Sequence, residues 1–247
     1  MNKLAVRALT AAGLVCAIGA NALADLSTNV FTIEARVGNQ VGTFIATQDQ
    51  GYWDWSGNFY WTLDGDVDIT DGGGNVLATL TGASVTVLHD PVVALNFNVQ
   101  AANQNTVFTV GSGLLSFSQL SNPVGAASAG VTVTDVNGNG ATLSPDGTTM
   151  YTSRYNGDFP GGTTFADLLG SSLSAGAFQS NSTSEEFPGG GNFVNVGSPV
   201  SSMSAGWTFS LSAFDLATGT STFVVVPTPA GLALLGCAGL VATRRRR

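Results

Sequence analysis

The hydrophobic and polar positions alternate with a period of two over most of the chain between Val30 and Arg154. Val, Ile, Thr and Phe dominate these stretches, and clusters of Gly, Asn and Asp interrupt them. This pattern is typical of short antiparallel strands. The predicted strands are Val30–Val37, Gly42–Thr47, Asn58–Leu63, Val67–Thr70, Val76–Thr81, Ser84–Leu88, Val92–Val99, Thr106–Val110, Leu114–Ser118, Gly130–Thr134, Ala141–Leu143 and Thr149–Tyr155. Strands this frequent favour an all-β fold, an antiparallel β-sandwich of jelly-roll-like type.

Two segments repeat a local theme, "VDITDGGGNVLATL" at 67–80 and "VTVTDVNGNGATL" at 131–143. Each has a β-branched strand, Thr-Asp, a Gly/Asn turn and then Ala-Thr-Leu. Glycine and asparagine tolerate the positive φ angles of tight turns, so both segments are predicted to form β-hairpins.

The pattern changes after Arg154. "FADLLGS" at 165–171 predicts one or two helical turns. Residues 171–206 are rich in Ser, Gly and Asn without a sustained period, which predicts a long irregular excursion whose phenylalanines dock on the sheet. Strands are predicted again at Trp207–Phe214 and Thr220–Val226, so residues 25–226 are expected to form a single domain.

The first 24 residues have the three parts of a secretory signal peptide. Lys3 and Arg7 supply the basic start, residues 8–20 the apolar stretch, and Ala22-Leu23-Ala24 an A-x-A cleavage site. The Sec translocon and signal peptidase are the expected partners, and the mature chain is expected to begin at Asp25.

Residues 227–247 form a second predicted targeting segment, "PTPAGLALLGCAGLVATRRRR". A helix starting near Ala230 and ending at Thr243 is about 21 Å long, whereas the hydrocarbon core of a bilayer is about 30 Å thick. Four cations follow, which favour the cytoplasmic side: Arg244, Arg245, Arg246 and Arg247. A helix this short suits a temporary membrane anchor, and an ordinary permanent anchor is the alternative.

A secretory signal, an acidic β domain, a Pro-x-Pro motif, a short apolar helix and terminal arginines together resemble the PEP-CTERM proteins. The motif of this chain is Val226-Pro227-Thr228-Pro229, where the family usually has Pro-Glu-Pro. The resemblance implies export, transient retention in the inner membrane, cleavage near the motif by an exosortase, and transfer to the cell surface or release. The stretch from about Val92 to Arg154 is also similar to β domains of such proteins, and this similarity implies no known chemistry.

The formal charge of residues 25–226 argues against one class of binding partner. Residues 25–226 hold two cations, Arg36 and Arg154, against all 16 acidic residues, a formal charge of −14. Such a surface repels phosphate backbones, so no nucleic-acid partner is expected. The same stretch has no cysteine, so its stability is expected to come from a packed core rather than from disulfides.

Four aspartates in "TLDGDVDITDGGGN" at 62–75 form the densest candidate for a metal site: Asp64, Asp66, Asp68 and Asp71. Alternating oxygen ligands near glycines suit calcium, although Ile69 and Asn75 stand where an EF-hand loop needs glycine and glutamate. The alternative is an exposed strand followed by a hairpin turn, and no cofactor is expected in that case.

The segment "GYWDWSGNFYW" at 51–61 contains three of the four tryptophans, Trp53, Trp55 and Trp61. Exposed aromatic rings on a β domain can stack on sugars, while inward-facing rings fill the core. Strand alternation cannot place all the rings on one face. The segment therefore predicts core packing for some of them, with a carbohydrate platform as the alternative.

Catalytic residues are not indicated by any motif. His89, the single histidine, precedes Asp90-Pro91 and is expected to be a turn residue; there is no G-x-S-x-G motif. The sequence thus predicts a non-enzymatic, exported cell-surface or matrix protein, with a carbohydrate-binding module for extracellular polysaccharide, assisted by calcium, as the alternative.

Overall fold

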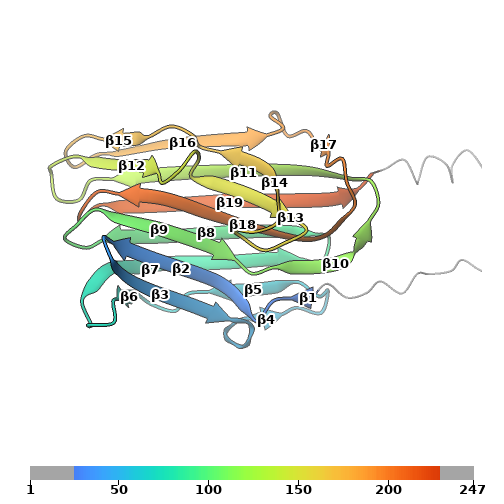
Figure 1. The fold of residues 1–247 in the computed structure, drawn as a ribbon, viewed down its shortest axis with the longest axis horizontal. Coiled ribbons are helices and arrows are strands. Elements are labelled where there is room, and N and C mark those ends of the chain that lie inside the picture. Colours follow the sequence, from blue (N-terminus) through green and yellow to red (C-terminus); the bar gives the residue numbers. More distant parts are fainter. Residues whose placement is uncertain (1–24, 229–247) are drawn as a thin grey trace, which may run out of the picture.

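The computed structural model describes residues 25–228, and this part of the chain is built from antiparallel strands and turns (Figure 1). Its one helical element is a 3₁₀ turn, Gln48–Gln50. The all-β fold predicted from the alternation is confirmed. The predicted signal helix and tail helix lie outside the described residues.

The first of the two sheets is built around strand β18. Its main path runs through β1 (Asp25–Leu26), β10 (Leu115–Leu120), β18 (Val200–Leu211), β9 (Thr106–Ser112), β2 (Asn29–Val37) and β3 (Gln40–Thr47). Four further strands extend it: β12 (Ala141–Pro145), β13 (Tyr151–Tyr155), β14 (Thr163–Leu168) and β15 (Leu173–Ala175). Both β12 and β13 pair directly with β18.

The second sheet faces the first and is centred on strands β19 and β8. Its path runs through β16 (Ser180–Phe187), β11 (Pro123–Thr134), β19 (Leu216–Pro227), β8 (Val92–Ala101), β7 (Val76–Leu88), β5 (Phe59–Thr62) and β4 (Tyr52–Trp53). Two short strands lie off this path, β17 (Val194–Asn195) on β11 and β6 (Val67–Thr70) on β7.

Aromatic side chains join the two sheets at the centre of the core. Trp207 of β18 is fully buried, with its ring centre 5.4 Å from that of Phe97 on β8, in an edge-to-face arrangement. The indole N–H of Trp207 donates to the hydroxyl of Ser221 on β19 over 3.3 Å. Phe97 also stacks on Phe209 at 5.5 Å. Inward-facing residues of both sheets thus fill one continuous apolar cluster.

The sandwich has two distinct ends (Figure 1). The tail end carries β1, the last residues of β19 and the turns 54–58 and 89–91. The far end carries the turns 38–39, 71–75, 102–105, 135–140 and 212–215. Both limits of the described chain therefore lie at the tail end.

The sequence D-x-x-G-N occurs three times, as "DWSGN" at 54–58, "DGGGN" at 71–75 and "DVNGN" at 135–139. The first two close hairpins in the same way: Asp54 and Asp71 each accept hydrogen bonds from two backbone N–H groups and from the asparagine side chain. The glycine takes a φ near +80° in each, which a type I turn with a following left-handed residue requires. The predicted hairpin at 67–80 is confirmed.

The predicted hairpin at 131–143 is wrong, although its turn has the same motif. Strand β11 belongs to the second sheet and β12 to the first, so the turn between them crosses the sandwich. Asp135 makes this possible, because its buried carboxylate accepts the backbone N–H groups of Gly138, Gly140 and Phe178 at 2.6–3.1 Å. Whether two consecutive strands form a hairpin is therefore decided by the strands with which each of them pairs, and not by the turn between them.

The predicted helical turns at 165–171 are also wrong. Residues up to Leu168 form β14, which pairs with β13. Ala166 and Leu168 point inward while Asp167 between them is exposed, which is the alternation of a strand. The edge pairing offered by β13 therefore overrides the helical propensity of Ala and Leu.

The predicted irregular excursion at 171–206 is largely wrong, because it contains β15, β16, β17 and half of β18. Ser204 and Gly206 of β18 are buried under the loop that follows β13: the Ser204 hydroxyl donates to the Gly157 carbonyl, and a Cβ on Gly206 would lie 2.4 Å from the Phe159 ring. In the sequence these small residues were interpreted as part of an irregular segment. In the structure they leave room for the loop after β13, which packs directly on them. Strand β16 is exposed throughout and is held by backbone pairing with β11.

Candidate functional site

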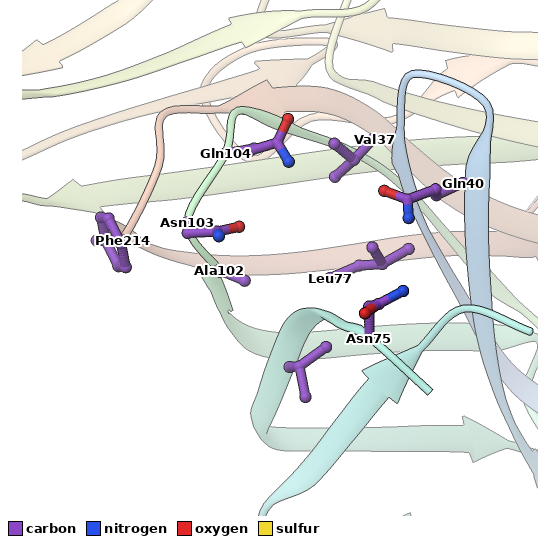
Figure 2. A pocket seen from close by; sticks show the side chains of 9 residues that line it. Val37, Gln40, Asn75, Leu77, Ala102, Asn103, Gln104 and Phe214 are labelled. Carbon is purple, nitrogen blue, oxygen red and sulfur yellow. The ribbon is translucent and has the colours of Figure 1, made fainter. Parts of the chain in front are cut away.

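A hollow of about 510 Å³ opens at the far end of the sandwich (Figure 2). Four turns that are distant in sequence surround it, those after β2, β6, β8 and β18. The residues that line it are Val37, Gln40, Asn75, Val76, Leu77, Ala102, Asn103, Gln104 and Phe214. Its size is that of a small-ligand site rather than of a packing defect.

Four of the nine lining residues are amides and none is charged. Gln40 and Asn75 are held in place by Asp71, whose Oδ2 accepts from their side-chain nitrogens at 2.8 and 2.9 Å. Hydrogen bonds from the side chain and backbone of Asn75 lower the pKa of Asp71, so this carboxylate stays ionised and keeps both amides oriented. Asn103 and Gln104 come from the turn between β8 and β9 (Figure 2). Such a wall offers uncharged donors and acceptors.

Phe214 forms the aromatic side of the hollow, across from Gln40 (Figure 2). Its backbone has a φ of 67°, a left-handed conformation that is costly for a bulky residue. Two hydrogen bonds hold it there: its N–H donates to the Ala102 carbonyl at 2.8 Å, and its carbonyl accepts from Gln100 Nε2 at 3.0 Å. The ring remains 48% exposed. The fold thus holds the backbone of Phe214 in a strained conformation that leaves its ring exposed at the surface.

Two buried carboxyl groups, Asp135 and Asp215, stiffen the turns at the far end. Burial raises the pKa of Asp215, and the neighbouring charge of Asp135 adds to this effect. Burial also opposes the ionisation of Asp135, but backbone N–H groups, led by that of Phe178, outweigh it and lower its pKa. Among the described residues, Oδ1 of Asp215 has no hydrogen-bond partner, whereas its Oδ2 accepts from the Ser212 hydroxyl. Neither group lines the hollow.

The four aspartates predicted as a calcium site are not brought together. Asp71 directs its oxygens into its own turn and to Gln40, and Asp68 accepts from the Thr79 hydroxyl at 2.8 Å. Asp64 and Asp66 lie between β5 and β6 on the surface. Within residues 25–228, no group of three or more His, Cys, Asp or Glu side chains is placed to hold a metal ion.

The aromatic segment divides between core and surface, as strand alternation requires. Trp61 is 5% exposed and stacks on Phe31 at 5.2 Å, so it is a core residue. Trp53 is 42% exposed and packs on Phe59, whereas Trp55 at the tip of the 54–58 turn is 98% exposed. The three tryptophans therefore do not form one platform.

The remaining predicted positions lie at the tail end. Asp25 begins β1 opposite Ser116. Val226 and Pro227 are the last residues of β19, paired with Val124 and Pro123, and the Thr228 hydroxyl donates to the Asn122 carbonyl. The signal positions Ala22 and Ala24, together with Pro229 and Arg244 to Arg247, lie outside the described residues.

His89 lies in the turn between β7 and β8, where its backbone N–H donates to Asn58 Oδ1 at 3.0 Å. In the part of the chain that the structure describes, no helix is long and apolar enough to cross a membrane.

Sequence reasoning missed the hollow because its walls come from four separate turns. The sequence also placed Phe214 at the end of a predicted strand, Trp207–Phe214, whereas the structure ends β18 at Leu211 and places Phe214 in the turn before β19. The amides gave no signal either, because Asn is common in turns whether or not it binds a ligand.

The comparisons with known proteins identify no family, since no family model and no curated protein matches the chain. Among solved structures, TmCBM61 in complex with β-1,4-galactotriose shares 11% identity over 55% of this chain and 71% of its own, with a TM-score of 0.23. A structure of infectious bursal disease virus, Gt strain, shares 12% over 84% of this chain and 67% of its own, at 0.21. At these TM-scores the likenesses support neither a fold assignment nor a function.

Proposed function

We propose that this protein is an exported cell-surface or extracellular-matrix structural protein, sorted by an exosortase through its C-terminal tail. The observation that supports this proposal is the sequence pattern itself, a signal peptide at 1–24 and a Pro-x-Pro motif, apolar stretch and arginine cluster at 227–247. The fold is compatible with it, because β19 leads straight into the motif at the tail end.

Mass spectrometry of the C-terminus of the surface protein tests the sorting. A host with an exosortase is expected to yield a chain that lacks residues 230–247, whereas the same host without the enzyme retains the tail. The Thr228→Glu variant restores the glutamate usual in the family and is expected to be processed at least as completely as the natural chain. An intact tail on the surface protein in the exosortase-containing host contradicts the proposal.

A second function, binding of a neutral polysaccharide, is favoured by the hollow at the far end. Its oriented amides match sugar hydroxyls, its exposed Phe214 ring offers a face for the apolar side of a sugar, and its lining carries no charge. The four turns that surround the hollow lie at the end opposite to β1 and the end of β19 (Figure 1). A protein held by its tail would therefore present this hollow away from the membrane.

Phe214→Ala tests this second function. Retention in gels that contain neutral polysaccharides is expected to weaken about tenfold, equivalent to about 1.4 kcal/mol, because the stacking face is removed. Phe193→Ala is the matched control, since Phe193 is 49% exposed and lies outside the hollow. No retention by any neutral polysaccharide, or an equal loss in both variants, contradicts the assignment.

A further inference from the structure

The turn at 54–58 presents one indole ring to solvent on a rigid support. Asp54 Oδ1 accepts the backbone N–H groups of Ser56 and Asn58 at 2.8 and 2.9 Å, and the Asn58 side chain donates to Asp54 Oδ2. Asn58 Oδ1 in turn accepts the His89 N–H, which ties the turn to its neighbour. Trp55 is thus held almost fully exposed by a turn that has little freedom to bury it. Such a rigid, exposed indole is available for contact with a partner.

This turn lies at the end where the chain enters its tail. Phe59 pairs with Val87, Val92 pairs with Val224, and the Val225 N–H donates to the Pro91 carbonyl. Strand β5, which follows the turn, is separated from β19 by β7 and β8, which amounts to three inter-strand spacings, or about 15 Å. The exposed indole and the C-terminal end of β19 therefore both lie at the tail end of the sandwich.

The connection between the domain and the expected membrane helix is short. Thr228 is attached to the sheet through the Asn122 carbonyl, and the helix is expected to start near Ala230. Two residues span at most about 7 Å. When the helix lies in a bilayer, the tail end of the domain is therefore held at the lipid surface.

We propose that the Trp55 turn contacts the lipid headgroup region of the membrane that holds the tail. This inference rests on the tail anchor proposed above. Tryptophan is favoured at this depth because its ring is apolar and its N–H can still reach water or headgroups. The turn contributes a second contact beside the tail and so orients the far-end hollow outward.

Two observations favour lipid over sugar as the partner of Trp55. The neighbouring rings form two separate pairs, Tyr52 with Tyr60 at 5.3 Å and Trp53 with Phe59 at 5.2 Å, so Trp55 has no companion for a stacking platform. The position beside the chain exit is the second observation. Exposed Asp49 and Asp90 lie near this end, so contact with zwitterionic lipid is expected to exceed contact with anionic lipid.

Fluorescence quenching in vesicles tests the contact. The full-length mature chain is reconstituted in phosphatidylcholine vesicles, with and without bromine-labelled acyl chains near the headgroup. The natural chain is expected to lose emission in the brominated vesicles, and Trp55→Phe is expected to abolish most of that loss. Adding anionic phosphatidylglycerol is expected to reduce the loss.

The control places a tryptophan at the opposite end. Phe214→Trp in the Trp55→Phe background is expected to add emission that brominated lipid does not quench. A chain that floats with the vesicles while Trp55 remains unquenched overturns the turn contact and leaves the tail anchor intact. A chain that does not float overturns the anchor and the contact together. Emission of Trp55 that responds to soluble polysaccharide instead of lipid assigns the ring to sugar and also overturns the proposal.

Discussion

Trp207→Ala is expected to lower the free energy of unfolding by about 4 kcal/mol, because it removes the largest fully buried side chain from the centre of the core. The rings of Phe97 and Tyr151, 5.4 and 5.1 Å from the indole, lose their contact at once. Ser221 also loses the N–H donor that links the two sheets. Denaturant unfolding measures the loss, and for a domain of this size it corresponds to a fall in melting temperature of about 12 °C.

Trp55→Ala is the matched control for this experiment. It removes the same side chain from a position that is 98% exposed, so its expected effect on the isolated protein in solution is within about 0.5 kcal/mol. Equal losses for the two variants would contradict the core described here.

Gly219→Ala is expected to destabilise the domain by about 2 kcal/mol, although alanine is only one carbon larger. Gly219 on β19 is paired with Phe97 on β8, and a Cβ would lie 2.3 Å from the Phe97 ring. The ring cannot move without disturbing its stack with Phe209 and its edge contact with Trp207. Chemical denaturation with tryptophan emission as the probe follows both the stability and the surroundings of Trp207.

Gly130→Ala provides the comparison on the same sheet. At Gly130 the nearest atoms to an added Cβ are at 3.6 Å, which is ordinary van der Waals contact. Alanine there is expected to leave the unfolding midpoint unchanged or slightly raised, because it removes the backbone freedom of glycine in the unfolded chain. An unchanged unfolding midpoint for Gly219→Ala would contradict the packing of Phe97 on Gly219.

The strands that alternate strongly were predictable from sequence. Val67–Thr70 matches β6 in both limits, and Val30–Val37 differs from β2 by one residue. The prediction split β7 at Gly82, where the structure has one strand with a shift in register between Leu80 and Gly82. Alternation marks a strand that buries one face, but a glycine within it does not tell a turn from a bulge.

Strands without alternation were not predictable. Strand β16 buries no side chain, and residues 202–207 of β18 are all buried, so neither shows the period of two. Both exist because neighbouring backbones offer hydrogen bonds. The motif D-x-x-G-N makes the same point, since 54–58 and 71–75 close hairpins while 135–139 crosses between sheets.

The sequence by itself determined the all-β class, the excess of negative charge, the tight turn at 71–75, and the targeting pattern at both ends. These follow from local composition and period, which are properties of neighbouring residues. Tertiary structure decided which tryptophans are exposed, that the four aspartates do not gather, and that amides from separate turns meet Phe214 in one hollow. It also placed the Trp55 turn beside the chain exit. Those outcomes depend on pairing between strands far apart in sequence, which no local pattern records.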